Sequence, residues 1–197
     1  LEVQAKYNKC DFILGSRAEK YEIGGKTITS DLIPFEQFRW FPNATVQYNL
    51  TNQIFFNMNY NKKITLPSTS ALNPNNTTYQ NQNINTVGNP NLQPTIFDNF
   101  EVKLSAFDYA YIGYSLSNAK NQVVQQVSLN GNVVENSNFN VSEVKIHNFN
   151  FAFPLPYMLF SKGLKETMKF DVNPDTLNFI YFYTGYQLHQ IPNLDTK

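Results

Sequence analysis

The sequence has little charge for its length. Of 197 residues, 15% are Asp, Glu, Lys or Arg, against roughly 25% in an average soluble domain, and the two signs cancel to zero. The lack of a basic excess argues against nucleic acid as a partner, because phosphate backbones reward positive patches. Aromatic residues make up 15% of the chain instead, and its polar residues are mostly neutral ones such as Asn, Gln, Ser and Thr.

Cysteine pairs, metal-ligand clusters and long apolar runs are also missing. Cys10 is the only cysteine and so forms no internal disulfide. His147 and His189 have no neighbours at ligand spacing, and no serine lies in a nucleophile-elbow pattern. No run of about 18 apolar residues is present, so no transmembrane helix is predicted. We therefore expect no metal, no cofactor and no enzymatic activity.

The chain begins inside a predicted strand. Residues Leu1 to Lys6 alternate apolar and polar side chains and do not resemble the charged-then-apolar leader of an exported protein. We interpret the chain as a fragment of a longer protein.

The dominant period of the sequence is two residues. Between residues 54 and 61, apolar side chains occupy one phase and asparagines the other, with Phe55 as the exception. A helix would scatter these residues around its circumference, whereas a strand separates them onto two faces. We expect the apolar phase to face lipid, at Ile54, Phe56, Met58, Phe100, Val102, Leu104 and Ile112.

The connections between predicted strands alternate between short and long. Soluble sandwiches have no reason to place every short turn at one end, whereas bacterial barrels have short periplasmic turns and long extracellular loops. The segment Pro154 to Asp175 breaks this alternation, and we have no account of it. The short turns are predicted at Asn8-Lys9, Thr51-Asn52 and Phe107-Asp108, and the long loops at residues 24–39, 65–98 and 118–140.

These patterns predict an all-β, antiparallel, up-and-down transmembrane barrel wall of about eight strands. Backbone groups in lipid must all be paired, which leaves closed barrels as the only β solution. The charged residues of the predicted strands lie on the polar phase, where a wet lumen tolerates them. We expect the lumen side to include Arg17, Glu19, Glu101 and Lys103.

Two other interpretations stay open from alternation alone. A soluble β-sandwich that binds a ligand such as a carbohydrate would alternate in the same way, with its apolar face as the core. A small eight-stranded barrel, complete in itself, would pair its first and last strands. The one-sided loop lengths and the scarce charge favour the wall of a larger barrel.

Residues 86–102 carry a resemblance to a known family. They read Thr-Val-Gly-Asn-Pro-Asn-Leu-Gln-Pro-Thr-Ile-Phe-Asp-Asn-Phe-Glu-Val, which resembles the G-N-P-x-L-x-P…N-x-E signature of TonB-dependent receptors. Residues 15–19 (Gly-Ser-Arg-Ala-Glu) are similar to that family's G-x-R-x-E strand. Residues 41–44 (Phe-Pro-Asn-Ala) are similar to its F-P-x-x strand start. Together with the L-N-P at residues 72–74, the resemblance covers about residues 12–154.

The resemblance implies that residues 1–197 are the C-terminal part of the barrel of an outer-membrane receptor in a Gram-negative bacterium. The family has a 22-stranded barrel, a plug domain in the same parent chain, and TonB as an indirect partner that supplies energy for nutrient uptake. Residues 65–98 would then be an extracellular loop. Its neutral polar composition suits a sugar or peptide, so we expect Tyr79 and Asn83 to contact the ligand.

Overall fold

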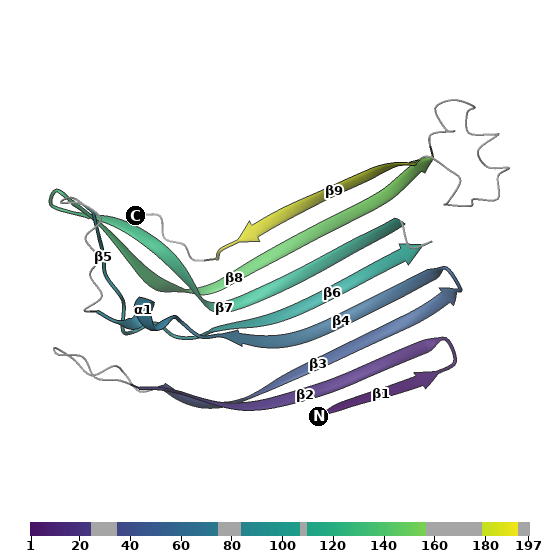
Figure 1. Cartoon of the computed structure of the whole chain (residues 1–197), viewed down its shortest axis with the longest axis horizontal. Helices are drawn as coiled ribbons and strands as arrows, with labels where there is room; N and C mark the ends of the chain where they lie inside the picture. Colours follow the sequence, from purple (N-terminus) through teal and green to yellow (C-terminus); the bar gives the residue numbers. More distant parts are fainter. Residues whose placement is uncertain (25–34, 75–83, 107–109, 157–178, 193–197) are drawn as a thin grey trace.

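The computed structural model describes residues 1–24, 35–74, 84–106, 110–156 and 179–192. They form a single sheet of nine strands and one short helix (Figure 1). The elements are β1 (Glu2–Tyr7), β2 (Cys10–Ile23), β3 (Phe35–Thr51), β4 (Ile54–Thr65), α1 (Thr69–Leu72), β5 (Ile84–Thr86), β6 (Thr95–Ala106), β7 (Ala110–Asn130), β8 (Val133–Pro156) and β9 (Phe179–Gln190).

The long strands are antiparallel neighbours in chain order. The order is β1-β2-β3-β4-β6-β7-β8, and β9 pairs with β8. In the described part of the chain, β1 pairs only with β2 and β9 only with β8, so the sheet is open with two free edges (Figure 1). One open sheet has neither the second layer of a sandwich nor the closure of a small barrel, and only the wall of a larger barrel remains of the three interpretations.

The predicted two-residue alternation is confirmed, and neighbouring strands keep it in phase. Met58 lies opposite Val46 on one side and Val102 on the other, and Val102 lies opposite Tyr114. A slip of one residue would move a strand's entire apolar set to the other face. The direct pairing therefore gives most of the sheet one apolar face and one polar face, whereas β9 also places Tyr181 and Tyr183 on the polar side.

The short turns agree with expectation, with one small shift. Asn8 at the β1–β2 turn has a φ of 54°, a conformation that asparagine tolerates better than most residues. The turn between β3 and β4 lies at Asn52-Gln53, one residue later than predicted, where the Gln53 amide donates to Thr51 Oγ1 at 3.2 Å. The turn predicted at Phe107-Asp108 lies outside the described residues.

The prediction of a loop at residues 118–140 is wrong, because β7 and β8 continue through it as a long hairpin. Its turn lies at Gly131-Asn132, and Gly131 has a φ of 63°, which glycine adopts at no steric cost. The Asn, Gln and Ser content suggested a loop. The strands contain the β-branched residues Val123, Val124 and Val127, and they pair residue by residue with β8.

Two other predicted loops are shorter than expected. β3 begins at Phe35 rather than after Arg39, and β6 begins at Thr95 rather than after Asp98. The region between β4 and β6 also holds α1 and the short strand β5. β5 pairs in parallel with the far end of β8, where Ile84 lies opposite Val134.

The G-N-P-x-L-x-P segment is docked onto the β7–β8 hairpin. Asn140 Nδ2 donates to the carbonyl oxygens of Gln93 (3.0 Å) and Asn121 (2.8 Å), and Asn140 Oδ1 accepts from the Gln93 amide (2.8 Å). Asn89 Nδ2 donates to the carbonyl of Asn138 at 2.9 Å. Asn121 has a φ of 54° and is left out of the β7–β8 pairing, although the register is the same on both sides of it. Its carbonyl accepts hydrogen bonds from the side chains of Thr95 and Asn140 instead. We call this docked segment, residues 88–94, the latch.

Gly88 is required at this latch because α1 comes very close to it. A Cβ built on Gly88 would lie 2.2 Å from the carbonyl oxygen of Asn73 and 2.9 Å from that of Ser70. Both obstacles are backbone atoms, which cannot rotate away. Leu72, at the end of α1, and Leu92, four residues after Gly88, are both buried.

We predict that Gly88→Ala destabilises the latch, by about 1–3 kcal/mol for the overpacking. Gly24→Ala is the matched control, because nothing lies within 4 Å of a Cβ at Gly24. The measurement is urea unfolding of the two variants in detergent micelles. Equal midpoints for both variants would show that Gly88 is not tightly packed.

Candidate functional site

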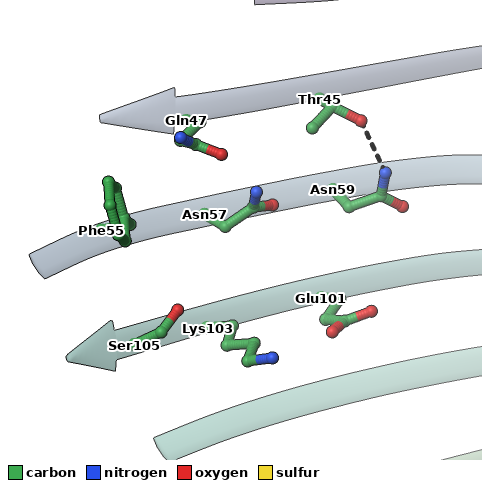
Figure 2. Close-up of a pocket in the computed structure, with 8 residues that line it drawn as sticks. All are labelled: Thr45, Gln47, Phe55, Asn57, Asn59, Glu101, Lys103 and Ser105. Carbon is green, nitrogen blue, oxygen red and sulfur yellow. Dashed lines mark hydrogen bonds between the residues drawn. The ribbon is translucent and has the colours of Figure 1, made fainter. Parts of the chain in front are cut away.

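The polar face carries a cavity of 530 Å³ across three adjacent strands (Figure 2). The register explains its composition, since Asn59 lies directly opposite Thr45 on β3 and Glu101 on β6, and Asn57 lies opposite Lys103. The lining residues are Thr45 and Gln47 of β3, Phe55, Asn57 and Asn59 of β4, and Glu101, Lys103 and Ser105 of β6.

Neutral side chains in and beside the cavity are joined to one another by a chain of hydrogen bonds. Asn59 Nδ2 donates to Thr45 Oγ1 at 2.7 Å, and Asn61 Nδ2 donates to Asn59 Oδ1 at 3.0 Å. The chain goes on through Asn99 Nδ2 to Asn61 Oδ1 at 2.9 Å, and Ser117 Oγ donates to Asn99 Oδ1 at 2.6 Å. This polar chain crosses four strands, and two of its members, Thr45 and Asn59, line the cavity.

Glu101 and Lys103 share the cavity, as predicted for residues of one phase. They do not form an ion pair with each other or with any other charged group in the part of the chain that the structure describes. Lys103 instead places its Nζ 4.4 Å from the centre of the Tyr111 ring, a cation–π contact. Glu101 and Lys103 also line an adjoining hollow of 300 Å³ with Asn150. The cavity therefore presents one negative and one positive group to whatever enters it.

Arg17 and Glu19 lie on the same polar face but away from the cavity. Arg17 Nε is 2.7 Å from Glu19 Oε1, and the Arg17 guanidinium lies 5.3 Å from the centre of the Phe41 ring. The Tyr21 hydroxyl also donates to Glu19. The structure therefore does not bring this pair together with Glu101 and Lys103, and the pair's charges are already compensated.

The opposite face is apolar and exposed. All seven residues that the sequence assigns to lipid lie on it, since they pair with residues of the same phase on the neighbouring strands, except that Ile54 pairs with Thr51 where the β3–β4 register shifts. Exposed fractions reach 57% at Ile112 and 49% at Phe149, a residue that the register adds to the set. An apolar surface this broad is rare on a soluble monomer.

Sequence reasoning missed part of the cavity. Thr45, Gln47 and Ser105 were not selected as site residues, although their phase was predicted for β3 and β6. The turn between β3 and β4 sets the register of these two strands. A correctly placed turn would have put Thr45 opposite Asn59 and Gln47 opposite Asn57. Tyr79 and Asn83, expected to contact the ligand, lie outside the described residues.

The described residues contain no group of three His, Cys, Asp or Glu side chains placed to hold a metal ion. His147 lies on the apolar face, where its Nδ1 is 2.9 Å from the Tyr114 hydroxyl. No helix in the described part of the chain is long and apolar enough to cross a membrane.

Comparisons with known proteins agree on the architecture. A model of the outer membrane protein beta-barrel family matches residues 1–195. No curated protein matches the chain. The ferric enterobactin receptor PfeA of Pseudomonas aeruginosa, a mutant in complex with enterobactin, is similar over 79% of this chain at 15% identity, with a TM-score of 0.54. The siderophore receptor PirA of the same organism is similar over 75% at 16% identity, with a TM-score of 0.51.

The chain spans about a quarter to a third of the length of these receptors, at 24% of PfeA and 31% of PirA. At such low identity the likeness shows a common fold and carries no information about ligand.

We predict that the two faces differ in access to water. Asn57→Cys, on the polar face, should react with a water-soluble maleimide many times faster than Met58→Cys, because thiolate forms only where water reaches the sulfur. The two positions are neighbours on β4, so local chain mobility is matched. The measurement is the labelling rate in lipid vesicles. Similar rates at both positions would contradict the assignment of the faces.

Proposed function

The chain belongs to the outer membrane protein beta-barrel family, and from this premise we propose that it is part of the wall of a TonB-dependent receptor that takes up a nutrient. Its place is the bacterial outer membrane, and its fold is that of receptor and transport barrels. The observation that carries the proposal is the division of one sheet into an exposed apolar face and a hollowed polar face.

The division supports a membrane wall on energetic grounds. Each exposed apolar residue costs free energy in water, of the order of 25 cal/mol per Å² of apolar area, and this cost disappears in lipid. The polar face gains in the opposite way from a wet lumen, where amides and charges stay hydrated. A soluble protein with this sheet would expose both an apolar face and two free strand edges, which promote aggregation.

The remaining parts of the receptor belong to the parent protein in this proposal. Neighbouring strands close the barrel at the free edges of β1 and β9, and a plug domain of the same parent chain fills the lumen. An inner-membrane TonB system supplies the energy. The low share of PfeA and PirA that the chain covers leaves room for all of these parts.

We place the contact with plug or ligand at the cavity between β3, β4 and β6. Its amides and hydroxyls offer donors and acceptors without net charge, which suits a neutral polar ligand such as a sugar or peptide. Glu101 and Lys103 add one uncompensated group of each sign, so they also suit a polar segment of the plug. Tyr79 and Asn83 remain proposed ligand contacts on the long loop.

We predict that a charge on the apolar face is costly and that the same charge on the polar face is tolerated. Met58→Lys should lower the free energy of unfolding by about 2–4 kcal/mol near the bilayer midplane. Asn57→Lys is the matched control, because its side chain faces the cavity. The measurement is urea unfolding of the parent barrel in phospholipid vesicles. Equal losses for both variants would remove the support for a lipid-facing wall.

We predict that cells without the parent gene lose growth on one limiting polar nutrient from a panel of oligosaccharides, oligopeptides and ferric chelates. A protonophore should abolish uptake of the same nutrient by wild-type cells, because TonB needs the proton gradient. Glu101→Gln should lower that uptake several-fold, with Met58→Leu on the opposite face as the control. Growth of the deletion strain on every nutrient, or uptake that survives the protonophore, would contradict the proposed receptor.

A further inference from the structure

The β7–β8 hairpin continues beyond the point where its neighbour β6 begins. β6 begins at Thr95, and its pairing with β7 reaches Ile96, which lies opposite Lys120. β7 itself pairs with β8 as far as Asn130. From residue 124 onward, β7 therefore has β8 on one side and, among the residues that the structure describes, no strand on the other.

The backbone of β7 directs hydrogen-bonding groups towards this open side. The carbonyl of Asn136 accepts from the Val87 amide at 2.9 Å, so it points away from β7. Val127 lies opposite Asn136, and its N–H and C=O groups therefore point away from β8 in turn. Because the direction alternates along a strand, the backbone groups of Gln125 and Leu129 face the same way as those of Val127.

This edge of β7, residues 125–129, is exposed and uncharged. Val127 and Leu129 are 64% and 74% exposed, and Gln125 is exposed as well. Residues 121–134 contain no charged residue and no proline. Natural sheets often protect an open edge with such residues, because unpaired backbone groups attract further strands. The edge of β7 lacks this protection and is suited to accept another strand.

The other edge of the same hairpin already binds an extended segment. Ile84, Asn85 and Thr86 of β5 pair in parallel with residues 134–136 of β8, and β5 lies alongside the hairpin (Figure 1). The Val87 amide extends this pairing by one hydrogen bond. The bound segment is short, neutral and rich in β-branched side chains. The hairpin therefore provides, within this chain, an example of the kind of segment that its edges bind.

We propose that the edge of β7 binds an extended, uncharged peptide, which adds a strand to the hairpin. The edge offers an N–H and a C=O at every second residue, about 7 Å apart, and this spacing matches the backbone of an extended peptide. The hydroxyl groups of a sugar do not repeat in this way. Val127 and Leu129 lie on one face beside the edge, so they favour apolar side chains at alternate positions of the peptide. A charged peptide finds no ion pair on residues 121–134.

This binding site rests on the proposed receptor function and narrows the ligand from a sugar or peptide to a peptide. The hairpin lies on the same side of the sheet as the long connection between β4 and β6. In the proposed receptor that side faces the medium. The edge of β7 then captures the peptide before it reaches the cavity between β3, β4 and β6.

The test measures how a fluorescein-labelled heptapeptide of alternating Val and Thr binds to the parent barrel in detergent micelles, by fluorescence anisotropy. Val127→Pro should weaken binding by about tenfold, because proline removes an N–H from the open edge. Val127→Thr is the matched control, since it keeps the backbone N–H and a β-branched side chain. It should bind the peptide within about twofold of the wild type.

A second peptide of the same sequence carries N-methyl groups on its inner amides and should not bind the wild-type barrel. This comparison leaves the protein unchanged, so it decides the matter even where Val127→Pro loosens the hairpin. The proposal is overturned if the first peptide does not bind, if the methylated peptide binds equally well, or if Val127→Pro and Val127→Thr bind alike. Displacement of the peptide by maltoheptaose would also overturn it.

Sedimentation of the barrel in the same micelles checks for another occupant of the edge. Dimers of the wild type that Val127→Pro abolishes would show that a second copy of the chain pairs there, and the peptide site would be wrong. None of these measurements depends on uptake. A strain that takes up an oligosaccharide through a barrel that binds no peptide would keep the receptor function and remove only the peptide site.

Discussion

Hydrogen bonding of the backbone is the constraint on which the structure depends. A strand in lipid has no water to satisfy its amides and carbonyls, so it must pair along its full length with two neighbours. Among the described residues the six strands β2, β3, β4, β6, β7 and β8 have antiparallel neighbours on both sides, and β1 and β9 leave one edge each for further strands. Full pairing in turn locks the phase of every strand to that of the next. A period of two in the sequence thereby becomes two chemically different surfaces.

The polar surface is not uniform, and its differences are the reason we propose a contact site at the cavity between β3, β4 and β6. Where opposite charges or amides fall on adjacent positions, they satisfy each other, as Arg17 does with Glu19 and Asn59 with Thr45. Glu101 and Lys103 are two residues apart on one strand, yet their charges stay uncompensated within the described residues. The cavity beside them thus keeps two charged groups available to an outside partner.

Sequence reasoning reached the fold class and the two faces of the sheet, because both follow from period two; the same period predicted that Glu101 and Lys103 share a face. It failed where polar residues build strands, as in the hairpin between residues 118 and 140. Apolar and polar side chains are mixed on both faces of this hairpin, so alternation fades while pairing continues. Thr45 and Gln47 were missed for another reason. Their place beside Asn57 and Asn59 depends on register, which a turn one residue from its predicted position controls.

The parallel pairing of β5 with β8 has a consequence for the order of assembly. β5 precedes β6, β7 and β8 in the chain, but its partner residues, 134–136, lie about fifty residues later. Hairpins between neighbouring strands close short loops and form first, whereas this contact must wait for the last of three strands. Until then Gly88 and Asn89 have no hairpin to dock on. We therefore expect the latch to form only after the β7–β8 hairpin.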